Sequence, residues 1–138
     1  MTTLTKTSAA ASRPVAELLR AAIVLLALAT AAIHLTLGGV LFTMNAVGYT
    51  ALAILMVVPG PIGRVRVFVR LALIGFTTAT IGGWLLFGAR FPLAYLDKAL
   101  EVALVAAVAF EVWYLDGGPA GVVRRTRSLV TDLVAAAR

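Results

Sequence analysis

Among the polar side chains that interrupt the long apolar stretches of this 138-residue sequence, six form the group that could do chemistry. They are His34, Asn45, Tyr49, Asp97, Lys98 and Glu101. Imidazole and carboxylate groups bind protons and cations, and an ionisable group within an apolar membrane segment is costly enough to suggest a function. Asp97, Lys98 and Glu101 share one flank of a helix, because residues three and four positions apart lie on the same face.

Motifs of the common enzyme classes are absent from the sequence. It contains no GxSxG, HExxH, Walker or GxGxxG motif. One histidine and no cysteine cannot assemble a His-plus-Cys metal cluster or a histidine-based nucleophile–base pair. We therefore expect no enzymatic activity, no metal site and no cofactor. A lesser alternative is haem b bound through His34, which would need a second axial ligand from another chain.

The composition predicts the elements that must position these residues. Apolar residues make up 62% of the chain and charged residues 13%, with a mean hydropathy of +1.02. Soluble domains are roughly 45–50% apolar and about 25% charged. The chain is also too short for two ordinary domains, which need ~100 residues or more each. These values predict an all-α membrane protein.

Charge-free stretches predict four membrane spans. Residues 21–63 contain no Asp, Glu, Lys or Arg, and a single helix of that length would measure about 64 Å against a hydrocarbon core of ~30 Å. That stretch must fold back once, and Gly38-Gly39 is the expected turn. A second charge-free run covers 71–89, and an apolar segment that includes a few charges covers 93–115. The predicted spans, at about 16–37, 45–58, 69–89 and 93–115, form a four-transmembrane-helix bundle within residues 13–116.

Basic residues predict the orientation of this bundle. The side that carries both termini and the loop between spans two and three holds ten of the twelve Lys and Arg residues, and the other side holds Arg90 and Lys98. The positive-inside rule then places both termini in the cytoplasm of an inner (plasma) membrane protein. The net charge of +6 reflects this topology, so we expect no nucleic-acid partner.

The four alternating spans bring the six polar residues to a similar depth, in the half of the bundle away from the termini. We expect His34 to face the bundle interior near a carboxylate of the fourth span, with Glu101 favoured over Asp97, because lipid supplies no polar partner. The alternative for the whole group is a structural network that fixes helix register. For Asp97 and Lys98 alone, the alternative is an interfacial charge pair. Glu111, near the other end, is expected to reach water or an arginine.

The two ends of the chain differ from the spans. Residues 1–12 are mostly Thr, Ser and Ala, which predicts a mobile tail. The basic residues that follow also resemble the start of a signal peptide, but the apolar run continues to Leu37, so we expect a retained span. Residues 117–138 place apolar and basic side chains at helical spacing. They predict an amphipathic interfacial helix on the cytoplasmic leaflet, with a solvated, partly disordered tail as the alternative.

Small residues recur at every fourth position in the last two predicted spans. They are Gly75, Ala79 and Gly83 in the third span and Ala99, Ala103 and Ala107 in the fourth. Such stripes allow helix backbones to approach closely in lipid. The sequence leaves open whether the stripes are used within one chain or between chains.

Short segments of the spans resemble those of small uncharacterised prokaryotic four-span membrane proteins. The segments are Ala31–Leu35, Asn45–Tyr49, Gly83-Trp84 and Leu93–Ala99. The resemblance covers roughly residues 16–115. It implies a four-span fold, and because that family has no established activity, it implies no catalytic residue.

These observations favour a non-catalytic membrane protein. The small size, the missing catalytic motifs and the small-residue stripes predict an accessory or assembly subunit of a larger membrane complex. Its expected partners are the lipid bilayer and other membrane subunits or further copies of itself. The alternative function is a small oligomeric transporter, or an ion- or proton-conducting protein, that uses the polar residues as its site.

Overall fold

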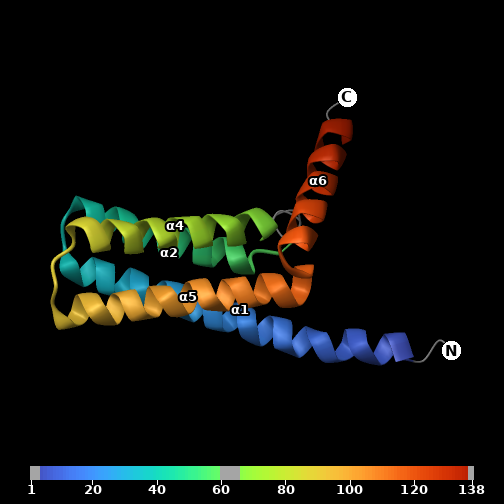
Figure 1. Ribbon diagram of the computed structural model, residues 1–138, viewed down its shortest axis with the longest axis horizontal. Helices are drawn as coiled ribbons and strands as arrows, with labels where there is room; N and C mark the ends of the chain where they lie inside the picture. Colours follow the sequence, from blue (N-terminus) through green and yellow to red (C-terminus); the bar gives the residue numbers. More distant parts are fainter. Residues whose placement is uncertain (1–3, 60–65, 137–138) are drawn as a thin grey trace.

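The computed structural model describes residues 4–59 and 66–136, with side chains from residue 13 onward. Within these ranges every regular element is an α-helix, which confirms the predicted all-α fold. The helices are α1 (Leu4–Leu37), α2 (Val40–Val57), α4 (Arg66–Phe87), α5 (Pro92–Asp116) and α6 (Gly118–Ala136). The first four lie side by side as a bundle, and α6 turns away from its end (Figure 1).

Glycine and proline set the helix boundaries. Gly38 and Gly39 have φ of 70° and 85°, a left-handed backbone region that glycine adopts readily and other residues rarely do. The chain therefore reverses between α1 and α2 at the predicted turn. Pro92 occupies the first turn of α5, where its missing N–H costs nothing, and Gly117 ends the helix in the left-handed conformation.

Three of the described helices are long and apolar enough to cross a membrane. They are residues Arg13–Leu37 of α1, the whole of α2 and the whole of α4. These three helices indicate a membrane protein. Helix α5, predicted as the fourth span, has 25 residues and packs in the bundle. It is not among these three helices, and it carries four charged residues in addition to its final residue, Asp116.

Two predicted boundaries shift in the structure. Helix α1 begins at Leu4 rather than near residue 16, so the segment expected to be a mobile tail is helical from Leu4 onward. Its run of alanines favours this, since alanine has the highest helix propensity. Helix α2 begins at Val40 rather than near residue 45, directly after the glycine turn. Residues 1–3, 60–65 and 137–138 lie outside the described part.

The core of the bundle combines small residues with a few large ones. Two alanines of α1 and two of α2 are buried beside Tyr49, Met56, Leu73 and Leu104. A Cβ on Gly48 would lie 2.6 Å from Cζ of Phe76. The absence of a side chain at Gly48 therefore allows α2 and α4 to approach closely.

The predicted small-residue stripes do not make such close approaches inside this bundle. Five of the six residues are exposed, and only Ala107 packs partly against the core. A Cβ on Gly75 or Gly83 would meet no atom within 4 Å. The reason is that α4 turns Leu73 and Thr77 toward the core, which directs the stripe to the opposite side. The stripe of α4 is thus left for contacts outside the chain or for lipid.

Candidate functional site

A buried polar cluster lies where α1, α2, α4 and α5 meet, in the half of the bundle nearer the Gly38-Gly39 turn. It consists of His34, Tyr49, Thr80, Asp97, Lys98 and Glu101. Four of these residues, His34, Tyr49, Asp97 and Glu101, are at most 2% exposed. One residue comes from each of α1, α2 and α4, and three come from α5, so the site exists only in the assembled bundle.

Glu101 is the centre of the polar cluster. Its Oε1 accepts hydrogen bonds from the Tyr49 hydroxyl at 2.9 Å and from the Thr80 hydroxyl at 2.9 Å. Its Oε2 accepts from Nζ of Lys98 at 2.6 Å. A buried carboxylate needs such donors, because burial removes its hydration. Glu101 therefore connects α5 to both α2 and α4.

Lys98 places its ammonium between two carboxylates. Nζ lies 2.9 Å from Oδ2 of Asp97 and 2.6 Å from Oε2 of Glu101. Asp97 is 1% exposed, so it is a buried member of the cluster rather than part of an interfacial pair. Its second oxygen, Oδ1, is buried and has no hydrogen-bond partner among the described residues.

His34 lies in the bundle interior between both carboxylates. Its Nδ1 is 2.9 Å from the carbonyl oxygen of Thr30, and a carbonyl only accepts, so Nδ1 carries the hydrogen. Nδ1 is also 3.5 Å from Oδ1 of Asp97, and Nε2 is 3.9 Å from Oε1 of Glu101. The sequence favoured Glu101 as the neighbour of His34, whereas Asp97 is the closer of the two.

Haem ligation fits this environment poorly. The His34 ring is flanked by the rings of Phe42 and Tyr49, at centroid distances of 5.9 and 5.7 Å. A haem with its iron bound to Nε2 would have to displace the Tyr49 ring or Glu101, which are both fully buried in the bundle. We therefore do not propose haem as a cofactor.

The observed cluster differs from the predicted one in two residues. Asn45 is half-buried, and no hydrogen bond among the described residues joins it to the cluster. Thr80, which the sequence analysis did not single out, donates to Glu101. Its position seven residues before the end of α4 matches the depth of Tyr49, but threonine is common in apolar helices and gives a weak signal.

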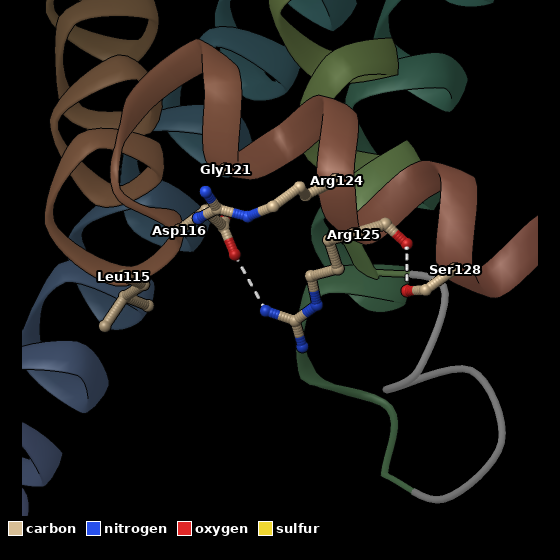
Figure 2. A pocket seen from close by; sticks show the side chains of 6 residues that line it. All are labelled: Leu115, Asp116, Gly121, Arg124, Arg125 and Ser128. Atoms are coloured by element: carbon tan, nitrogen blue, oxygen red, sulfur yellow. Dashed lines mark hydrogen bonds and ion pairs between the residues drawn. The ribbon is translucent and has the colours of Figure 1, made fainter.

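A second buried network joins the other end of the bundle to α6. Arg70 donates to both oxygens of Glu111, at 3.0 and 3.3 Å, and to Asp116 at 2.7 Å. Arg125 of α6 donates to the other oxygen of Asp116, also at 2.7 Å, as Figure 2 shows. Of the two partners expected for Glu111, water or an arginine, the structure supplies an arginine.

The arginine network also borders an open hollow at the corner between α5 and α6 (Figure 2). The hollow is lined by Leu115, Asp116, Gly121, Arg124, Arg125 and Ser128. At this corner a Cβ on Gly121 would overlap the carbonyl oxygen of Asp116. Glycine at this position is therefore what allows α6 to turn so sharply from α5.

No protein-family model, curated protein or solved structure matches the chain. The resemblance to small four-span prokaryotic proteins remains a prediction from the sequence. The polar cluster, the arginine network and the exposed stripe of α4 are the features that bear on function.

Proposed function

We propose that the chain is a non-catalytic, four-span integral membrane protein that serves as a small accessory or assembly subunit. The observation that carries this proposal is the outward stripe of Gly75, Ala79 and Gly83 on α4. Small residues on a lipid-exposed face let a second helix approach closely, and close packing is a main driving force for helix association in lipid. The bundle itself does not use this stripe.

The burial of its charges supports α5 as the fourth span. Asp97, Glu101 and Glu111 are at most 1% exposed, and each has a cationic partner in the polar cluster or the arginine network. The outward face of α5 presents apolar residues such as Val102 and Phe110. A helix of 25 residues measures about 38 Å, which exceeds the ~30 Å hydrocarbon core.

The distribution of basic residues supports a topology with both termini in the cytoplasm of an inner (plasma) membrane. Helix α6 and the first part of α1 project from the same end of the bundle (Figure 1). Helix α6 combines three arginines in its first half with exposed apolar residues such as Val130 and Leu133 in its second half. This pattern suits a helix that lies on the cytoplasmic leaflet.

Cysteine labelling tests this topology. We expect Ala89→Cys, in the connection between α4 and α5, to react with a membrane-impermeant thiol reagent added to intact cells. Arg124→Cys on α6 should react only after the membrane is permeabilised. The native chain has no cysteine, so neither variant has a background signal. Labelling of Arg124→Cys in intact cells would contradict the proposed orientation.

A pair of glycine substitutions tests the accessory role. Gly83→Leu should leave the thermal stability of the purified chain unchanged, since its Cβ meets no atom within 4 Å, and should abolish co-purification of partner subunits. Gly48→Leu, which would force a side chain into Phe76, should instead destabilise the fold by about 1–3 kcal/mol. The measurements are pull-down from native membranes with mass spectrometry and a thermal melt in detergent. If Gly83→Leu retains every partner of the unmodified chain, the stripe is not an assembly surface.

A second candidate function is a small transporter or an ion- or proton-conducting protein. The buried polar cluster favours it, because ionisable groups inside membrane bundles commonly mark ion and proton pathways. An ion-flux assay with the chain reconstituted in lipid vesicles separates the two functions. Flux that Glu101→Gln abolishes would support conduction, and an accessory subunit would give none.

A further inference from the structure

We propose that the polar cluster is a binding site for one divalent transition-metal ion, with His34, Asp97 and Glu101 as its ligands. One potential ligand atom from each of these residues lies within 4.8 Å of the others, and all three residues are buried. An imidazole nitrogen with two carboxylate oxygens suits ions such as Zn²⁺ or Mn²⁺, whereas Mg²⁺ and Ca²⁺ prefer oxygen ligands alone. This site goes beyond the accessory role and does not depend on it.

The environment of His34 orients it as a metal ligand. Nδ1 donates to the Thr30 carbonyl at 2.9 Å, which leaves the lone pair on Nε2. Metal-binding histidines ordinarily have their other ring nitrogen held in this way by a carbonyl or carboxylate. Nε2 is 3.9 Å from Oε1 of Glu101, and an ion with bonds of about 2.1 Å separates two of its ligand atoms by roughly 3–4 Å.

Asp97 supplies a second, independent indication of a ligand. Its Oδ1 is buried without a hydrogen-bond partner among the described residues, and it lies 3.5 Å from Nδ1 of His34. A buried carboxylate oxygen without a partner is costly. Because Nδ1 carries the hydrogen, an ion on Nε2 would bind this oxygen after the Asp97 side chain turns toward Nε2, and would then remove that cost.

The charges of the cluster favour a divalent ion over the Lys98 ammonium, which neutralises only one of the two carboxylates. With His34 neutral, two carboxylates and the Lys98 ammonium leave one negative charge in excess inside the bundle. A divalent ion in place of the ammonium would make the site neutral, which burial favours. The Lys98 side chain is 12% exposed, so it lies at the edge of the cluster and can turn outward. The Lys98 ammonium thus competes with the metal ion for the carboxylates of Asp97 and Glu101.

Binding to the full-length chain in detergent, without a polyhistidine tag, tests the proposal. Calorimetric titration with ZnCl₂ should give one site, and MgCl₂ should give none. Lys98→Met should bind Zn²⁺ at least about tenfold more tightly, since it removes the competing ammonium. His34→Gln should weaken binding at least about a hundredfold. Asn45→Ala, one helical turn before Tyr49 on α2 and without a hydrogen bond to the cluster among the described residues, should bind like the unmodified chain.

Each outcome decides the proposal. If the folded unmodified chain and Lys98→Met both fail to bind Zn²⁺ and Mn²⁺, no metal site exists and the cluster is a structural network. Binding that His34→Gln leaves unchanged would place the metal elsewhere and overturn the assignment. If His34→Gln does not fold, the Lys98→Met variant decides. Zn²⁺ binding that is tighter than that of the unmodified chain supports the site, and equal or weaker binding contradicts it. The accessory role rests on the stripe of α4, so failure here leaves that proposal unaffected.

Discussion

Arg70→Met is expected to lower the free energy of unfolding by about 3–5 kcal/mol, the range typical of a buried ion pair that loses one partner. Arg70 is 4% exposed and is the only described cation bonded to Glu111, which is fully buried. Without it, Glu111 would remain an unpaired carboxylate inside the bundle, and Asp116 would keep Arg125 alone. Denaturant unfolding in detergent micelles, followed by circular dichroism, measures the loss.

Two comparison variants separate the lost ion pair from the lost side chain. Arg124→Met on the exposed face of α6 should change stability by no more than about 0.5 kcal/mol. The double variant Arg70→Met with Glu111→Met should recover most of the loss, because a buried pair can often be replaced by apolar residues without penalty. If Arg70→Met costs no more than Arg124→Met, the arginine network does not stabilise the bundle.

Glu101→Leu is expected to cost a similar amount, about 3–5 kcal/mol. The substitution removes the acceptor shared by the hydroxyls of Tyr49 and Thr80 and one of the two carboxylates that hold Lys98. Tyr49→Phe removes only the hydroxyl that contacts Glu101 and Thr80, and should cost about 1–3 kcal/mol. The measurement is the same unfolding titration. Val102→Leu, on the exposed face of the same helix, is the control and should be close to neutral.

A double-mutant cycle shows whether the polar cluster acts as one unit. Tyr49→Phe and Glu101→Gln should show a coupling energy of about 0.5–3 kcal/mol, as residues within one hydrogen-bond network do. Additive effects of the two substitutions would mean that Tyr49 and Glu101 stabilise the bundle independently. The contact of 2.9 Å between them would then be energetically unimportant.

Features that depend on short stretches of chain could be predicted from the sequence. The apolar composition required helices, because only helices satisfy the backbone of a chain spanning lipid without a partner strand. The charge-free run of residues 21–63 required a reversal, and Gly38-Gly39 was the place where the backbone could make it. Helix length then brought His34 and Glu101 to a similar depth.

The contacts among these residues depended on the rotation of each helix about its axis. In water, an amphipathic pattern indicates which face of a helix is buried. Helix α4 is apolar on all sides apart from its threonines and arginines, so the sequence did not show that Thr80 faces inward or that the stripe from Gly75 to Gly83 faces outward. Only the packing of α4 against α2 and α5 decided this.

The sequence by itself thus determined the helical fold, the position of the first turn and the common depth of the polar groups, since each follows from local chain properties and the thickness of a bilayer. The tertiary structure alone decided that Arg70 pairs with Glu111, that Asn45 stays outside the polar cluster, and that Asp97 lies closer than Glu101 to His34. The physical reason is that both the core and the lipid are apolar. Hydrophobicity then gives no preference for one helix rotation over another, and the choice falls to side-chain packing and to the pairing of buried charges.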